Sequence, residues 1–275
     1  MRSAHRAPPP ELLSGIRAVT LDFGNTLVPV TRTALRSVVL VAAAAVCPRL
    51  GIGSVDDFLA AWADERDRQF REDVPKFREV ELPRRAVRVL ARMRGVRPPQ
   101  PDDRWDDAAA AGRSTEGEIS MLVDAYSGAF VDGIPAPAGS GRIIAELADR
   151  GFLVAILSNW PLASTIDRFA ERAGWLPFLH GVYVSERIGT IKPHPAVFEH
   201  AASDMRMHPA QILHVGDDWA ADVAGALGAG WHAAYLTGHQ ADTSLPTSEQ
   251  SDHLRADLVI AALGDLSSRL SDPTA

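Results

Sequence analysis

Two apolar segments that each end in an aspartate, far apart in the sequence, constrain this chain more than any other feature. Residues 16–21 form the first segment and lead into Asp22, and residues 212–215 form the second and lead into Asp217. Short apolar runs of this kind are typical of buried parallel strands. Ligand sites of open α/β sheets lie at the carboxyl ends of such strands. We therefore expect Asp22 and Asp217 side by side, where two like charges favour a cation between them.

The second half of the sequence alternates between strand-like and helix-like patterns. This alternation predicts an α/β fold, a Rossmann-like core built on a parallel sheet with right-handed crossovers. We expect strands over 17–22, 152–157, 181–185, 211–215, 232–236 and 257–260, and helices over 139–150, 161–173, 194–206, 219–228 and near 262–270.

A long helical insertion is expected directly after the first strand. No convincing strand pattern occurs from about Thr31 to Phe130. Glycine- and proline-rich breaks separate the helical patterns there, and Gly133 to Pro137 resembles a hinge. The expected helices cover 32–47, 54–71, 80–94 and 115–130. The resulting organisation is a flexible tail over 1–14, a core over 15–30 and 135–275, and an all-helical domain over 31–134.

Composition favours a cytoplasmic enzyme over a nucleic-acid or membrane protein. The net charge of −7 and a pI of 5.7 argue against a surface that coats nucleic acid. The single cysteine, Cys47, excludes an internal disulfide framework. The apolar run Val38 to Cys47 is too short to span a bilayer, and no secretory signal is expected in the polar, proline-rich start.

Three further polar segments lie at expected strand ends or in the loops that follow. Ser158 and Asn159 end one strand, Lys192 lies in a loop stiffened by two prolines, and Asp222 follows Asp217 on the next helix. Each has a plain structural alternative. The aspartates and Ser158 could cap helices or turns, and a loop lysine is usually a solvated charge.

Taken together, four segments resemble the motifs of the haloacid dehalogenase superfamily, in the branch with a helical cap inserted between the first two motifs. The segments are Asp22-Phe23-Gly24-Asn25-Thr26-Leu27, Leu157-Ser158-Asn159, Lys192 within residues 189–198, and residues 214–226 with Asp217, Asp218 and Asp222. They occur in the family order. The resemblance covers residues 15–30 and 135–270, and the insertion matches only in being helical.

The resemblance implies a phosphatase that binds Mg²⁺. Asp22 would be the nucleophile that forms an aspartyl-phosphate. Asp22, Asp217, Asp222 and the carbonyl of Gly24 would hold the metal, with Asp218 as an outside candidate.

The same resemblance implies a phosphate site. Ser158 would bond a phosphoryl oxygen, assisted by backbone amides near Phe23, Gly24 and Asn159. Lys192 would neutralise the cluster and steady both the nucleophile and the phosphate.

Gly24 departs from the family pattern. Most phosphatases of the family carry there a second aspartate that protonates the leaving group, and loss of such a group typically costs about two to four powers of ten in rate. Three interpretations follow: a phosphatase in which another group supplies the proton, a 2-haloacid dehalogenase, or a degenerate binding protein. The retained Asp217 and Asp222 favour the phosphatase, because dehalogenases of the family need no metal.

The insertion is expected to set the substrate. Residues 62–94 hold ten Arg or Lys against seven Asp or Glu. The plain interpretation is a salt-bridged helix pair. The alternative is that one or two of these cations face the site and bind a second anionic group of the substrate; the candidates are Arg66, Arg71, Lys76, Arg78 and Arg84. Trp62, Phe70 and Phe77 are expected to pack the helices together.

A cap closing over the site would exclude bulk water and bar large substrates. The expected substrate is therefore a small phosphorylated metabolite, with a sugar phosphate as one candidate, and the expected state of the protein is a monomer or homodimer.

Overall fold

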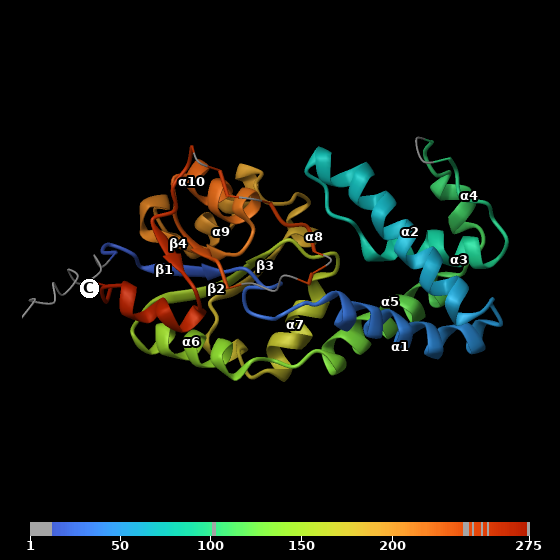
Figure 1. Ribbon diagram of the computed structural model, residues 1–275, viewed down its shortest axis with the longest axis horizontal. Helices are drawn as coiled ribbons and strands as arrows, with labels where there is room; N and C mark the ends of the chain where they lie inside the picture. Colours follow the sequence, from blue (N-terminus) through green and yellow to red (C-terminus); the bar gives the residue numbers. More distant parts are fainter. Residues whose placement is uncertain are drawn as a thin grey trace, which may run out of the picture.

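A computed structural model describes residues 13–100, 103–238, 242–243, 245–248, 250–251 and 253–273. It confirms the expected fold class, because a six-stranded parallel sheet with strand order β3-β2-β1-β4-β5-β6 forms the core (Figure 1). The strands are β1 (Ala18–Leu21), β2 (Leu153–Ser158), β3 (Gly181–Val184), β4 (Ile212–Gly216), β5 (His232–Leu236) and β6 (Leu258–Ile260). The first twelve residues of the expected tail lie outside the described residues, whereas Leu13 pairs with Leu270.

The register of the central strands brings the candidate residues to one edge of the sheet. Leu21 of β1 pairs with Ile156 of β2 on one side and with Val215 of β4 on the other. The chain therefore leaves β1 toward β2 and later returns to its other side with β4. Such a switch point opens a crevice at the carboxyl ends of the strands, and Asp22 follows β1 at that edge.

The two faces of the sheet are covered by different helices. Val19 and Leu21 belong to the core cluster shared with the helices α6 and α7, whereas Ala18 belongs to the cluster shared with α9 and α10. This alternation is what a strand buried on both faces requires. Figure 1 shows α6 and α7 on one side of the sheet and α9 and α10 on the other. The helices are α6 (Ala138–Asp149), α7 (Ala163–Arg172), α8 (Ser185–Ile188), α9 (Pro195–Met205) and α10 (Gly225–Gly228).

The regular elements in the described part of the insertion between β1 and β2 are all helical, as expected. It contains α1 (Arg32–Leu50), α2 (Val55–Asp73), α3 (Leu82–Met93), α4 (Asp107–Ala111) and α5 (Glu116–Gly133). These helices lie together beyond one edge of the sheet (Figure 1). Capping fixes where they begin: the side chain of Thr31 accepts from the amide of Ala34, and Ser54 and Thr115 each form a capping box. The short helix α4 was not expected from the sequence.

Helix α1 is longer than the apolar run that suggested it. Its 19 residues are long and apolar enough, by length and composition alone, to cross a membrane. In the structure one face, which includes Val38, Ala42 and Val46, is buried, and α1 packs against α5. The opposite face leaves Leu40 and Val41 exposed. This pattern is that of a helix packed on one side in the insertion.

Two expected helices differ in form. The segment near 262–270 is not a continuous helix but two 3₁₀ turns, Leu263–Asp265 and Ser267–Arg269. Gly264, Ser267 and Ser268 are weak helix formers, and Leu270 is held beside Leu13. The helix expected over 219–228 begins as a π-helix, Trp219–Ala224, and becomes α-helical only at α10.

Candidate active site

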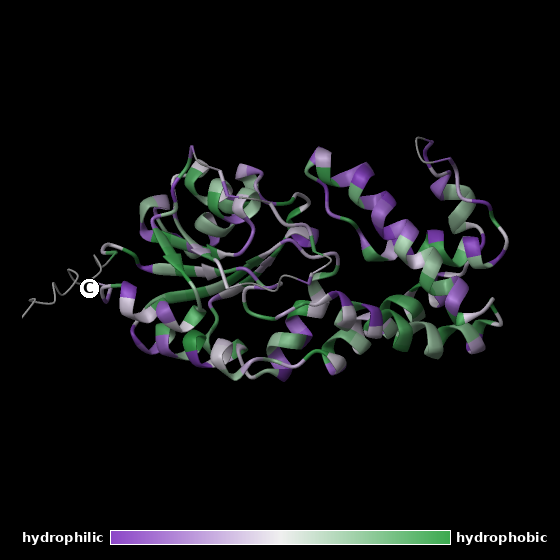
Figure 2. Ribbon diagram, viewed as in Figure 1, coloured by the Kyte–Doolittle hydropathy of each residue, from purple (hydrophilic) through white to green (hydrophobic). Residues whose placement is uncertain are grey.

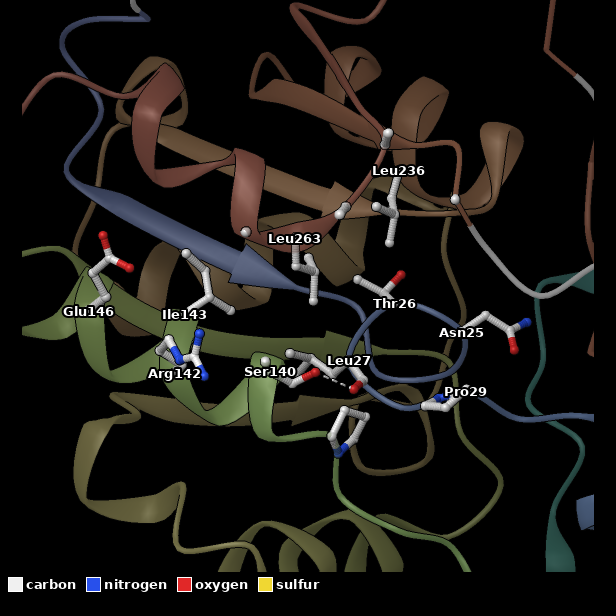
Figure 3. A pocket seen from close by; sticks show the side chains of 16 residues that line it. Asn25, Thr26, Leu27, Pro29, Ser140, Arg142, Ile143, Glu146, Leu236 and Leu263 are labelled. Carbon is white, nitrogen blue, oxygen red and sulfur yellow. Dashed lines mark hydrogen bonds between the residues drawn. The ribbon is translucent and has the colours of Figure 1, made fainter.

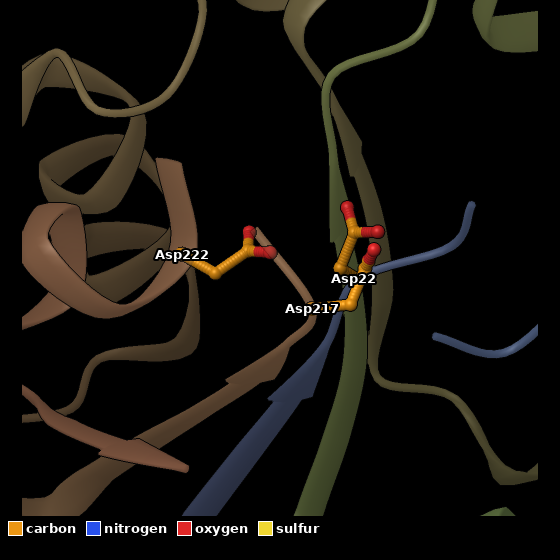
Figure 4. Close-up of side chains that lie close together, drawn as sticks. All are labelled: Asp22, Asp217 and Asp222. Carbon is orange, nitrogen blue, oxygen red and sulfur yellow. The ribbon is translucent and has the colours of Figure 1, made fainter. Parts of the chain in front are cut away.

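Three buried aspartates meet at the carboxyl edge of the sheet. Asp22 follows β1, Asp217 follows β4, and Asp222 lies on the π-helix after β4 (Figure 4). One carboxylate oxygen of each lies within 4.8 Å of the others. The pairing of Asp22 and Asp217 expected from the sequence is therefore present.

Lys192 lies inside this cluster and is 2 % exposed. Its Nζ donates to Oδ1 of Asp22 at 2.8 Å, to Oδ1 of Asp222 at 2.6 Å and to the carbonyl of Leu157 at 2.8 Å. The backbone of Lys192 is fixed in turn by Asn159. The side chain of Asn159 accepts from the Lys192 amide at 2.8 Å and donates to the Lys192 carbonyl at 3.0 Å. Asn159 thus positions the lysine loop against the end of β2.

His214 is part of this cluster, although no chemical role was expected for it from the sequence pattern. It pairs in register with Thr20 on β1, and Thr20 Oγ1 lies 2.9 Å from His214 Nδ1. On its other side, His214 Nε2 lies 3.1 Å from Oδ1 of Asp222. Burial, reinforced by the charge of Lys192, lowers the pKa of His214. A buried neutral imidazole therefore links the sheet to Asp222. The available sequence signal was a polar residue in an otherwise apolar strand.

The electrostatics of the cluster divide its carboxylates into two kinds. Burial raises the pKa of Asp22 to about 6, against the opposing attraction of Lys192. Burial and the nearby charges of Asp22 and Asp222 raise the pKa of Asp217 to about 8. Burial would also raise the pKa of Asp222, but Lys192 and His214 outweigh it and hold that pKa well below its usual range. Lys192 alone therefore does not neutralise the cluster.

The loop after Asp22 contributes hydrogen bonds that hold the cluster in place. The hydroxyl of Thr26 donates to Oδ1 of Asp217 at 3.0 Å, a contact not expected from the sequence. Asn25 adopts a left-handed backbone with φ of 60°, a conformation that asparagine tolerates better than most residues. Its side chain accepts from the amide of Val30 and donates to Thr243. Phe23 packs its side chain in the core, against Trp160 and Phe169, so only its backbone amide is available to a phosphate.

Gly24 faces a side chain from a distant segment. A Cβ at this position would lie 2.6 Å from Cδ1 of Leu245 and 3.3 Å from Cζ3 of Trp160. Leu245 comes from the segment between β5 and β6, for which the sequence suggested no role. Its amide donates to the hydroxyl of Thr243. The place of the usual second aspartate is thus occupied by an apolar side chain.

Ser158 and Asp218 take the positions that the sequence suggested, with different partners. Ser158 ends β2, is 1 % exposed, and lies close enough to Asp22 for its hydroxyl to moderate the raised pKa of that carboxyl. Asp218 caps the π-helix, because its Oδ1 accepts from the amide of Ala221 and from the hydroxyl of Ser248. It is outside the three-carboxylate cluster. The plain alternative of a helix cap therefore holds for Asp218.

A cavity of about 320 Å³ opens from this cluster toward the insertion. The sheet edge contributes Asp22, Gly24, Ser158, Asn159, Lys192, Asp217 and Asp222, and the insertion contributes Arg66, Phe70, Glu79, Arg85 and Tyr126, among others. Elements far apart in the sequence therefore enclose one site.

Most basic residues between positions 62 and 94 form ion pairs with acidic side chains of the insertion. Of the five suggested cations, only Arg66 lines the cavity. Arg78 and Arg84 both bind the buried Asp73, and much of the α2 ribbon is coloured hydrophilic in Figure 2. The plain interpretation of a salt-bridged helix pair thus explains most of the positive charge. Arg85, which also lines the cavity, was not among the suggested residues.

The aromatic residues of the insertion divide in the same way. Trp62 is buried between Phe58 and Tyr126 and packs the helices together, as expected. Phe70 lines the cavity. Phe77 is 42 % exposed and contacts His194 of the core, at 5.5 Å between ring centroids.

A second cavity of about 350 Å³ lies behind the loop that follows β1 (Figure 3). The hydroxyl of Ser140 at the start of α6 donates to the carbonyl of Leu27 there, at 2.6 Å. Arg142 and Glu146 are the charged side chains that line it. Neither Lys192 nor any of the three clustered aspartates lines this cavity. We therefore assign it no part in the chemistry of the cluster.

A parallel sheet, a helical insertion after β1 and an aspartate–lysine cluster at the strand ends define a Rossmann-like α/β protein with a charged site at the carboxyl edge of its sheet. A family model described as haloacid dehalogenase-like hydrolase matches residues 16–230. The chain belongs to this family. The resemblance seen in the four sequence motifs is thereby confirmed, and the protein is a hydrolase.

Relatives with assigned names include phosphatases. A ribulose-1,5-bisphosphate 5-phosphatase from Halopiger xanaduensis is 27 % identical over 162 residues, which cover 58 % of this chain and 67 % of that protein. A glyceraldehyde 3-phosphate phosphatase from Methanopyrus kandleri is 30 % identical over 106 residues, 38 % of this chain and 42 % of that protein. Apart from the first, the leading relatives are matched over less than half of their own length.

Solved structures similar to this one carry both activities of the family. A 2-haloacid dehalogenase from Pseudomonas syringae pv. Tomato DC3000 matches with a TM-score of 0.60 and 20 % identity, over 92 % of this chain and 96 % of that chain. A phosphatase of the family from Thermococcus onnurineus matches with a TM-score of 0.55 and 18 % identity, over 91 % and 96 %. At these identities the likeness establishes the fold, and the choice of reaction depends on the site.

Proposed function

We propose that this protein is a Mg²⁺-dependent phosphatase that hydrolyses a small phosphorylated metabolite through an aspartyl-phosphate at Asp22. The observation that carries the proposal is the cluster of Asp22, Asp217 and Asp222, whose ligand oxygens lie within 4.8 Å of one another. A metal-free attack on carbon would need only one of these carboxylates.

The donor set fits a hard divalent cation. All three groups are carboxylates, and oxygen ligands are those that Mg²⁺ prefers. Asp217 carries a strongly raised pKa because burial and two neighbouring carboxylates oppose its charge. That unbalanced negative charge is what a bound cation would relieve. Asp22, Asp217 and Asp222 would hold it, with the carbonyl of Gly24 as a further oxygen ligand. When bound, Mg²⁺ would neutralise the carboxylates and polarise the phosphoryl group.

The residues of the chain account for the two chemical steps. A carboxylate oxygen of Asp22 forms a bond to phosphorus while the ester bond to the leaving alkoxide breaks. Lys192, which already donates to Oδ1 of Asp22, steadies the nucleophile and the negative phosphoryl oxygens, and Ser158 and backbone amides near Phe23, Gly24 and Asn159 bind those oxygens. Water then attacks phosphorus, which releases inorganic phosphate and restores Asp22.

The leaving alkoxide must gain a proton that Gly24 cannot provide. Leu245 lies over this position and has no proton to transfer either. The proton would therefore come from the substrate itself, from water, or from a residue on the insertion. This gap restricts fast turnover to substrates with good leaving groups.

The site disfavours the two alternatives. A dehalogenase of this family needs Asp22 but no metal, which leaves Asp217 and its supporting bond from Thr26 without a function. A degenerate binding protein has no need to keep Lys192 hydrogen-bonded to both Asp22 and Asp222.

The insertion over residues 31–134 would act as the cap domain on the core formed by 15–30 and 135–275. The cavity of about 320 Å³ between them has the size of a small-metabolite site, which supports such a substrate over a nucleic acid or a folded protein. The buried free Cys47 is compatible with the reducing cytoplasm.

Asp22→Asn tests the role of the nucleophile. The amide is a poor nucleophile and carries no charge for a metal, so phosphate release from a panel of phosphorylated metabolites should fall at least about a thousand-fold. Circular dichroism should show an unchanged fold. An Asp22→Asn protein that hydrolyses a good substrate at the wild-type rate would reduce Asp22 to a structural residue.

A further inference from the structure

Arg85 is a buried cation on the insertion side of the active-site cavity. It lies in the first turns of α3, is 4 % exposed, and lines the same cavity as Asp22 and Lys192. A charged side chain in such a place requires a partner, because burial of an unpaired charge is costly.

The contacts of Arg85 within the described residues satisfy only part of its guanidinium group. The Nε of Arg85 donates to Oε1 of Gln69 at 2.8 Å, and its guanidinium lies 5.5 Å from the centroid of the Trp62 ring. Within the described part of the chain, no carboxylate lies within 4.0 Å of Arg85 and no atom accepts from its two terminal nitrogens.

Neighbouring arginines of α3 show what a fully paired cation looks like here. Arg84 binds Asp73, Arg88 binds Glu72 and Asp107, and Arg92 binds Asp64 and Glu65. Arg85 alone on this helix faces the cavity and has no carboxylate partner among the described residues.

Glu79, an acid of the insertion that lines the same cavity, is hydrogen-bonded to other residues. Glu79 accepts from the hydroxyl of Ser185 with one oxygen and from the amide of Val80 with the other, the latter at 2.9 Å. Burial raises the pKa of Glu79, which weakens it as a counter-ion, and its charge acts on Arg85 only from beyond the 4.0 Å of an ion pair. Burial also lowers the pKa of Arg85, but only to about 10, which leaves the guanidinium charged at neutral pH.

Arg66 and Tyr126 line the same cavity and lie close enough to Arg85 to affect its pKa. Arg66 lines it and has a side chain that is 28 % exposed, although Asp67 balances part of its charge. Tyr126 also lines it, and its hydroxyl forms no hydrogen bond with another described residue. Two guanidinium groups and a hydroxyl form a donor set suited to an anion.

We propose that Arg85, with Arg66 and Tyr126, is a second anion subsite, so that the substrate is a small phosphomonoester with a second anionic group at its far end. This inference rests on the proposed function, which places the reacting phosphate at Asp22 and Lys192. Carboxylate and phosphate share the chemistry that Arg85 recognises. The cavity of about 320 Å³ limits the molecule that joins the two ends to a short one.

Matched substrates test the subsite. With wild-type protein and Mg²⁺, 3-phosphoglycerate should be hydrolysed with a higher kcat/KM than glycerol 3-phosphate, which has an alcohol in place of the carboxylate. Propanediol bisphosphate and propanediol monophosphate form the second pair, in which a phosphate at the far end is compared with an alcohol. At least one anionic member should be preferred about ten- to a hundred-fold, the range of a charge-assisted bond to a buried cation. The pair with the larger ratio of kcat/KM, anionic over neutral-ended substrate, identifies whether the subsite prefers a carboxylate or a phosphate.

Three variants separate recognition from folding. Arg85→Gln should erase the preference, chiefly by raising KM for the anionic substrates, and should lower kcat/KM for the anionic substrates far more than for the neutral-ended ones. Arg85→Lys keeps the charge and should restore part of the preference even if the glutamine variant folds poorly. Arg71→Gln removes an exposed charge of α2 that does not line the cavity, and it should leave both ratios unchanged.

Binding separates this inference from the proposed function. Calorimetric titration of the Asp22→Asn protein with 3-phosphoglycerate and with propanediol bisphosphate requires no turnover. If no phosphate ester is hydrolysed but binding weakens about ten-fold or more with Arg85→Gln, the subsite stands and the proposed function falls. The subsite would be overturned if the wild type had equal kcat/KM values for the two members of each pair. Equal losses of kcat/KM on both members with Arg85→Gln would also overturn it.

Discussion

Gly24 and Leu245 together define the unusual feature of the catalytic centre at the scale of single residues. The position two residues after the nucleophile has no side chain, and Leu245 from a distant segment fills the space beside it. The contact at 2.6 Å from an added Cβ involves only the end of a flexible side chain, so it is removable. An acid at position 24 requires two changes, Gly24→Asp and the removal of the Leu245 side chain, and each can be made and measured separately.

Wild-type protein should depend strongly on its leaving group. Aryl phosphates should be cleaved much faster than alkyl phosphates of similar size, because general-acid assistance matters most where the departing alkoxide is most basic. Gly24→Asp with Leu245→Ala should narrow that difference by about ten-fold or more, whereas Leu245→Ala alone should not. Gly24→Asp alone should be less active than the double variant, because the new carboxylate meets Leu245. Nearly equal kcat/KM values for the two ester types in the wild type would show that another group already donates the proton.

Strand β4 shows how one element delivers several parts of the site. It carries His214, ends at Gly216 and leads directly into Asp217. A Cβ at Gly216 would overlap the carboxylate of Asp222, whose Oδ2 accepts from the amide of Asp218 at 2.9 Å. The absence of a side chain at Gly216 therefore lets Asp222 lie against the strand end and reach Lys192.

Gly216→Ala tests this packing. The added methyl group must push Asp222 away, which breaks its bonds to Lys192 and Asp218. We expect kcat to fall at least about ten-fold and the protein to lose about 1–3 kcal/mol of stability, as overpacked sites do. Steady-state kinetics and urea unfolding measure the two effects. Gly228→Ala, at a glycine with open space around its Cβ position, is the matched control. Wild-type kinetics in Gly216→Ala would contradict the role given to Asp222.

The elements that sequence patterns could predict are those with strong local signals. The strands that end at Leu21 and Gly216 were recognisable because apolar runs lead into carboxylates, and the helices of the insertion because their caps and breaks are local. The segment near Leu263 was wrongly expected to be a helix, since glycine and two serines weaken it and pairing of Leu270 with Leu13 competes. Leu245, His214 and Arg85 were missed because only tertiary contacts give them a role.

At the scale of the whole molecule, the buried charge links stability to pH and metal. The folded state retains a proton on Asp217, with a pKa of about 8, and on Asp22, with a pKa of about 6, that the unfolded state loses near 4. Raising the pH from about 4 to about 8 therefore removes protons that only the folded state holds. The free energy of unfolding of the metal-free protein should fall across this range.

Mg²⁺ should reverse that loss. It binds the deprotonated carboxylates of the folded state, so the rise in Tm on adding it should be larger at pH 8 than at pH 5.5. Differential scanning calorimetry with and without Mg²⁺ at the two pH values measures this. Asp217→Asn, which removes one ligand and the strongest raised pKa, should remove most of the difference. An equal rise in Tm at both pH values would show that Asp217 is not at the metal.

Activity after removal of metal is the measurement that tests the phosphatase proposal most directly. Phosphate release from an aryl phosphate should vanish after exhaustive treatment with EDTA and dialysis, and return when Mg²⁺ is added back. The reason is that a dianionic phosphate cannot approach Asp22, Asp217 and Asp222 while their charge is unbalanced. Full phosphatase activity in EDTA, or metal-independent release of halide from a 2-haloacid, would contradict the account and assign the site to a different reaction.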